Sequence, residues 1–159
     1  ELEETIEALN YALSYEPSNG KALCLLAKIY AEQLGDYEKA KSLYAEALAN
    51  NLEMVSIYPE YLYVLLYNED YEEALKLIDF AVGVKGIDKA VIYTIQAQIY
   101  EALKMYKKAL KSFKAAKIYA FNNNYISFLK AEKERIKDKM PKKKKAKSKT
   151  KKQKKKKKK

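Results

Sequence analysis

The chain has 159 residues, of which 48% are hydrophobic and 33% charged, with a formal net charge of +11; this apolar content can bury a core, so we expect a folded domain. It has no His and one Cys, which excludes the usual zinc ligand sets, a His general base, a Ser-His-Asp triad, a CxxC redox pair and an internal disulfide. Because it also lacks a Gly-rich phosphate loop and any apolar stretch near the ~18 residues that span a membrane, we expect a soluble binding protein that is not an enzyme and needs no cofactor.

The charge changes along the chain. Residues 1–88 hold 6 Lys or Arg against 17 Asp or Glu, whereas residues 89–140 hold 12 against 4. The last 19 residues, 141–159, hold 14 Lys and no acidic residue. Hydrophobic residues almost vanish after Pro141, so the sequence predicts a folded domain over 1–140 and a self-repelling, low-complexity tail over 141–159.

The folded part repeats with a period of 34 to 35 residues. Small residues recur at two positions of the period, and an aromatic residue lies three positions before the first of them. The first set is Thr5, Ala40, Ala74 and Ala109, the second is Ala12, Ala47, Ala81 and Ala116, and the aromatic set is Tyr37, Tyr71 and Tyr106. This period is typical of helical repeats, in which each unit is a pair of helices that buries its apolar face against its neighbours.

Over residues 1 to about 119, the sequence resembles the tetratricopeptide repeat (TPR) family. The first helix of a family unit carries a small residue and then an aromatic one, as Ala27 and Tyr30, and Ala97 and Tyr100, do here. The resemblance implies an all-α fold, namely a right-handed α-α superhelix of about 3.5 TPR-like repeats with a C-terminal capping helix.

In chain order, the first predicted unit is residues 1–17, a half repeat that supplies only a second helix and ends near Pro17. Because the chain begins with Glu1 and with half a unit, we expect a piece of a longer protein. Whole repeats follow over 20–52, 53–87 and 88–120. Three asparagines from Asn122 onward offer N-cap side chains for a polar capping helix over 122–140.

The resemblance also implies a binding site, because the concave face of a TPR array usually holds a segment of another protein. The residues that would line this groove are Lys21, Cys24, Lys28, Ala31, Tyr63, Leu66, Thr94, Gln98 and Glu101. Chaperone-binding members carry a carboxylate clamp in the groove, and its matching positions here are Cys24, Lys28, Glu60, Val91 and Ile95. These residues do not form that clamp, so we do not expect the groove to bind chaperone C-terminal peptides.

The lysines of the tail are the second candidate site. Each phosphate that they neutralised would release counterions, so we expect salt-dependent, sequence-indifferent binding to RNA, ribosome or DNA. The residues concerned are Lys142, Lys143, Lys144, Lys145, Lys147, Lys149, Lys151, Lys152, Lys154, Lys155, Lys156, Lys157, Lys158 and Lys159. The same segment also fits an inert solubilising extension, a nuclear import signal or an anionic lipid anchor.

The sequence thus predicts a non-catalytic adaptor, with a protein segment in the groove and a polybasic tail that tethers it to nucleic acid or ribonucleoprotein. Two alternatives remain, namely a plain protein-interaction module with an inert or nuclear-import tail and a regulatory repeat domain of a larger enzyme. A metal, a cofactor or a small-molecule substrate is not expected. The lone Cys24 fits a reducing compartment, so we expect a cytoplasmic location, with a nuclear one as the alternative.

Overall fold

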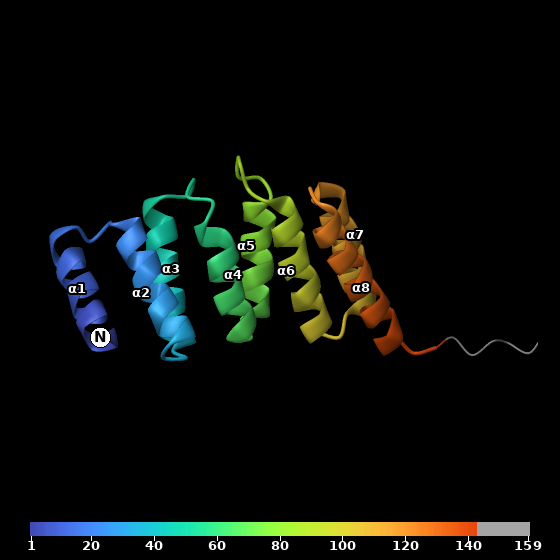
Figure 1. Cartoon of the computed structure of the whole chain (residues 1–159), viewed down its shortest axis with the longest axis horizontal. Coiled ribbons are helices and arrows are strands. Elements are labelled where there is room, and N and C mark those ends of the chain that lie inside the picture. Colours follow the sequence, from blue (N-terminus) through green and yellow to red (C-terminus); the bar gives the residue numbers. More distant parts are fainter. Residues whose placement is uncertain (143–159) are drawn as a thin grey trace, which may run out of the picture.

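The structure is a computed structural model that describes residues 1–142. Within this range the chain forms eight helices and no strand, arranged in a row from the N-terminal to the C-terminal end (Figure 1). The helices are α1 (Leu2–Tyr15), α2 (Gly20–Glu32), α3 (Tyr37–Asn50), α4 (Ile57–Tyr67), α5 (Tyr71–Ala81), α6 (Lys89–Ala102), α7 (Tyr106–Tyr119) and α8 (Asn123–Lys139). The predicted all-α, TPR-like solenoid is therefore confirmed.

The helices pack in consecutive pairs: α2 against α3, α4 against α5, and α6 against α7. Their repeating small residues allow this close approach, since Ala27 and Ala40 in the first pair and Ala97 and Ala109 in the last pair are fully buried. The first helices of the pairs also touch one another, α2 with α4 and α4 with α6. They therefore form one continuous face of the array.

Polar side chains fix where several helices begin. Asn19 accepts a hydrogen bond from the Ala22 amide at the start of α2, and Asp36 accepts one from the Lys39 amide at the start of α3. Asn122 does the same for α8, as its sequence predicts. Each of these side chains satisfies an amide that has no partner within its own helix.

The turn inside each repeat uses one left-handed residue at an equivalent position. Gly35, Glu69 and Lys104 have φ angles of 66°, 62° and 57°, and each is followed, two positions later, by the first residue of the second helix. Only the first repeat places Gly there, although a side chain with a Cβ is disfavoured in this conformation. The close packing of the paired helices imposes the turn on the other two repeats.

Replacing Lys104 with Gly is therefore expected to stabilise the protein. Relief of the left-handed strain outweighs the greater freedom of Gly in the unfolded chain, and we expect a net gain of about 0.5–1 kcal/mol. Urea unfolding of the full chain measures it. Lys111→Gly, at an exposed position inside α7, is the control and should lose about 1 kcal/mol; a loss of stability in Lys104→Gly would contradict the argument.

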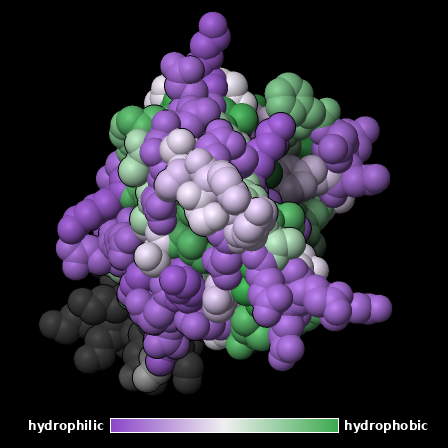
Figure 2. Space-filling view, turned by 90° about the vertical axis from the view of Figure 1, so that its left-hand side faces the viewer, coloured by the Kyte–Doolittle hydropathy of each residue, from purple (hydrophilic) through white to green (hydrophobic). Residues whose placement is uncertain are grey.

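The two ends of the array differ. Helix α1 has no buried residue, and the end that it forms shows apolar groups between polar ones (Figure 2). At the other end α8 packs on α7 and buries Leu129 and Ile136, while Phe128 next to Leu129 is 42% exposed. Helix α8 therefore covers the last repeat, the role that its sequence predicts.

Candidate protein-binding groove

A pocket of about 320 Å³ lies where α2 and α3 meet α4, on the face formed by the first helices. Its size is at the lower end of the range for ligand sites, suited to a side chain rather than to an extended ligand. Its lining combines four tyrosines with three charged residues and two small apolar ones. They are Lys28, Ala31, Glu32, Tyr37, Tyr44, Glu60, Tyr63, Val64 and Tyr67.

Three tyrosine rings form a continuous aromatic surface along this pocket. The ring of Tyr67 lies 6.1 Å from that of Tyr37 and 6.2 Å from that of Tyr63, measured between centroids. The interplanar angles are 35° and 20°. Tyr67 is 62% exposed, and the other two are half-buried, so part of this aromatic surface is accessible to a ligand.

The charged groups of the pocket are only partly paired. The hydroxyl of Tyr44 donates a hydrogen bond to Glu60 Oε2 over 3.0 Å, and the burial of Tyr44, followed by the charge of Glu60, raises its pKa. Lys28 Nζ lies 3.9 Å from Glu32 Oε1, with about half of each side chain exposed. Such an exposed ion pair contributes little stability and leaves both groups available to a ligand.

Cys24 lies one helical turn before Lys28 on α2 and is half-buried. Burial first, and then the negative charge of Glu60, raises the pKa of its thiol to about 11. The thiolate is the nucleophilic form, so at neutral pH this thiol is unreactive. Cys24 therefore acts in this face as a small apolar residue.

The structure brings part of the predicted groove together. Lys28, Ala31 and Tyr63 line the pocket, and Lys21 and Cys24 continue the same side of α2 toward its N-terminus. Leu66 is half-buried against the hydrophobic core instead of lining the pocket. The open part of the predicted groove is thus the part between α2 and α4.

The part of the groove predicted on α6 differs in the structure, because α8 lies over it. Thr94 is only 3% exposed, and its hydroxyl forms a hydrogen bond of 2.6 Å with that of Tyr125. Glu101 accepts two hydrogen bonds from the guanidinium of Arg135, at 2.6 and 2.7 Å. Gln98, which lies between Thr94 and Glu101 along α6, is half-buried, and its Oε1 atom is unpaired within residues 1–142. The capping helix therefore occupies the positions that a ligand would take in an uncovered repeat.

Two of the tyrosines that define the pocket carry a signal in the sequence. Tyr63 and Tyr67 stand one helical turn apart and have no place in the repeat pattern of buried residues. Tyr61 shares that property, yet it is 6% exposed and donates a hydrogen bond to Glu73. Tyr37 belongs to the recurring aromatic set of the repeat, and in the structure it contributes to both the core packing and the pocket.

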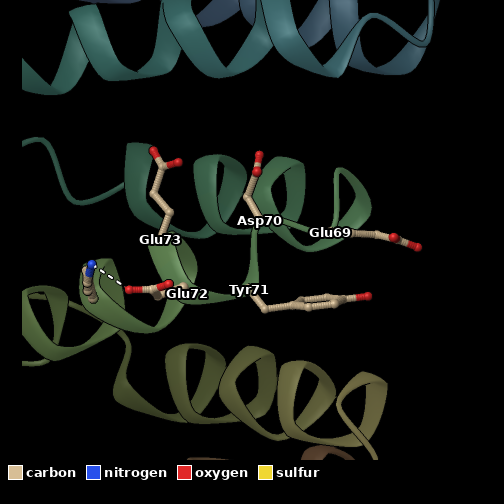
Figure 3. A pocket seen from close by; sticks show the side chains of 6 residues that line it. Glu69, Asp70, Tyr71, Glu72 and Glu73 are labelled. Atoms are coloured by element: carbon tan, nitrogen blue, oxygen red, sulfur yellow. Dashed lines mark ion pairs between the residues drawn. The ribbon is translucent and has the colours of Figure 1, made fainter.

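A second pocket, at the turn between α4 and α5, is acidic. It is lined by Glu69, Asp70, Tyr71, Glu72, Glu73 and Lys76. Figure 3 shows that these side chains spread apart, with Asp70 directed toward the neighbouring helix and Glu69 away from it. Asp70 forms an ion pair of 2.8 Å with Lys41, and Glu72 one of 2.9 Å with Lys76. No group of carboxylates among residues 1–142 is arranged to hold a metal ion.

These features define a TPR-like helical solenoid with an aromatic pocket on the face of its first helices. No protein-family model matches the sequence, and no curated protein matches it. Among residues 1–142, no helix is long and apolar enough to cross a membrane.

Solved structures of MamA, a TPR-like protein, share this fold. One is MamA 41-end from Desulfovibrio magneticus RS-1, and another is the MamA RS-1 ArsTM double mutant. Each is 20% identical in sequence, with a TM-score of 0.65, over 86% of this chain and 78% of the MamA chain. At this identity the likeness shows the fold alone.

Proposed function

We propose that this chain is a non-catalytic adaptor that binds a segment of another protein in the groove between α2 and α4. The observation that carries the proposal is the pocket lined by partly exposed tyrosines in a solenoid of TPR-like fold. Aromatic side chains supply large contact areas at a low cost in conformational entropy, which makes them the usual anchors of protein interfaces. The unreactive Cys24 thiol and the absence of His support a role in binding rather than in catalysis.

The test is a selection of random 12-residue peptides on the full chain. Peptides that bind in the groove should lose about tenfold or more in affinity when Tyr63 is replaced by Ala, since a central aromatic anchor carries 1–4 kcal/mol at an interface. Tyr119→Ala, which removes an exposed ring from α7, is the matched control. Peptides that tolerate Tyr63→Ala as well as they tolerate the control would contradict the proposed site.

We also propose that the Lys-rich segment 141–159 tethers the adaptor to nucleic acid or ribonucleoprotein. Apart from Pro141 and Lys142, this segment lies outside the described residues. The folded part offers specific support, because five lysines on α7 are exposed and none of them forms an ion pair within residues 1–142. They are Lys107, Lys108, Lys111, Lys114 and Lys117.

Binding to RNA and DNA by the full chain is expected to need the tail and to fall steeply with salt. The affinity should drop about 10³-fold or more between 50 and 200 mM salt if six or more phosphates are neutralised. Fluorescence anisotropy with the full chain and with a chain ending at Met140 measures this. Equal binding by the two chains would move the site to α7, and no binding by either would favour the plain interaction module with an inert or nuclear-import tail.

A further inference from the structure

We propose that the pocket between α2, α3 and α4 binds a cationic side chain, Lys or Arg, presented by the partner segment. The inference rests on the proposed groove function and specifies the chemistry of its ligand. Tyr37, Tyr63 and Tyr67 form a run of neighbouring aromatic rings in the lining of the pocket, and the carboxylates of Glu32 and Glu60 belong to the same lining. A ring face is the negative end of its quadrupole, so both kinds of group attract a cation.

The charged residues in and around the pocket also favour a cationic ligand. Lys28 is the one cation in the lining, and Glu32 partners it, while Glu60 accepts a hydrogen bond from Tyr44 and has no cationic partner among residues 1–142. The pocket lies within residues 1–88, which hold 17 acidic against 6 basic side chains. The local charge around the pocket is therefore negative, and it favours basic over acidic segments at this face.

The same chain already uses the proposed contact elsewhere. Lys89 Nζ lies 5.3 Å from the ring centroid of Tyr119, and Lys108 Nζ lies 5.4 Å from that of Tyr100. Both distances are within the ~6 Å range of a cation–π contact. In the pocket the rings have no such intramolecular cation over them among the described residues, and a cation from a partner would take that place.

The test titrates small probes into the full chain labelled with ¹³C at its Tyr rings, observed by NMR. The probes are N-acetyl-lysine methylamide, its arginine analogue and its norleucine analogue, which keeps the aliphatic stem but lacks the charge. We expect the two cationic probes to bind about fivefold more tightly than norleucine and to shift the ring signals of Tyr37, Tyr63 and Tyr67. Repeating the titration on a chain ending at Lys142 removes the tail lysines as competitors and should sharpen the difference.

Two variants isolate the proposed contacts, each with a matched control. Glu60→Gln removes a charge without changing shape, and Tyr67→Leu removes a ring face while keeping apolar area. Both variants should bind the lysine probe several-fold more weakly. Glu46→Gln and Tyr119→Leu, at exposed positions on α3 and α7, should leave it unchanged.

Equal binding of norleucine and lysine would overturn the inference, since the pocket would then be an ordinary apolar one. A fourth probe, N-acetyl-glutamate methylamide, tests the opposite charge, and its preferential binding would also overturn the inference, since Lys28 would then dominate. Failure here is distinguishable from failure of the adaptor proposal. Selected peptides without Lys or Arg that still lose affinity in Tyr63→Ala would support the groove while contradicting its preference for cations.

Discussion

Phe113→Ala is expected to lower the free energy of unfolding by about 3–5 kcal/mol, a large part of the 5–15 kcal/mol available to a typical domain. Phe113 is fully buried and belongs to the smaller of two core clusters, where α6, α7 and α8 meet. Its loss leaves a cavity beside Ala97 and Leu129 that small neighbouring side chains cannot fill. Urea unfolding measures the change.

The matched control is Phe121→Ala, because Phe121 is 94% exposed and should change stability by less than 0.5 kcal/mol. Repeat arrays lose stability locally, since each unit contacts only its neighbours. Hydrogen exchange in Phe113→Ala should therefore accelerate in α6 to α8 and stay nearly unchanged in α2 and α3. Uniform acceleration along the chain would contradict this local picture and indicate a single cooperative unit.

Glu101→Gln is expected to lower the free energy of unfolding by about 1–2 kcal/mol at neutral pH and by much less near pH 2. The hydrogen bonds from Arg135, together with the ammonium of Lys139, lower the pKa of Glu101 to about 2 from its usual 4.5. A depressed carboxyl pKa contributes stability that is complete above the unfolded value and is lost as pH falls through the folded value. The contribution should therefore decline below about pH 4.5 and be mostly lost by about pH 2.

The expected loss in the free energy of unfolding is smaller than the full pKa shift would give. The reason is that 41% of the Arg135 side chain and 45% of that of Lys139 are exposed, so water screens both charges. Urea unfolding of the full chain and of Glu101→Gln across this pH range gives the difference curve. Glu134→Gln is the control, since that carboxylate forms only an exposed ion pair with Lys137 inside α8. A difference between Glu101→Gln and the full chain that persists at pH 2 would exclude this ion-pair network as its cause.

The fold could be predicted because small residues that allow close helix packing recur at the same position of several repeats. Ala40, Ala74 and Ala109 recur at one period, and all three are fully buried between helices. Local signals such as Asn122 also gave the start of the capping helix. The left-handed turns at Glu69 and Lys104 could not be predicted from their own residues, because tertiary packing imposes a conformation that these side chains disfavour.

The candidate site could be predicted only in part. The family resemblance places Lys28 and Tyr63 on the face where the structure has its aromatic pocket, because their positions depend on the helix repeat alone. The surroundings of Thr94 and Glu101 could not be predicted, since they depend on how α8 packs against α6. That packing involves contacts between residues more than thirty positions apart, such as Thr94 with Tyr125.

The position of α8 also limits the length of any ligand. A segment running along the first helices from α2 to α6 would have to displace Tyr125 from Thr94 and break the bonds between Arg135 and Glu101. A segment confined to α2 and α4 meets no such competitor among the residues that the structure describes. If the groove binds a protein segment as proposed, the capping helix limits the length of the segment that binds without competition, because a longer segment competes with the chain's own C-terminal helix.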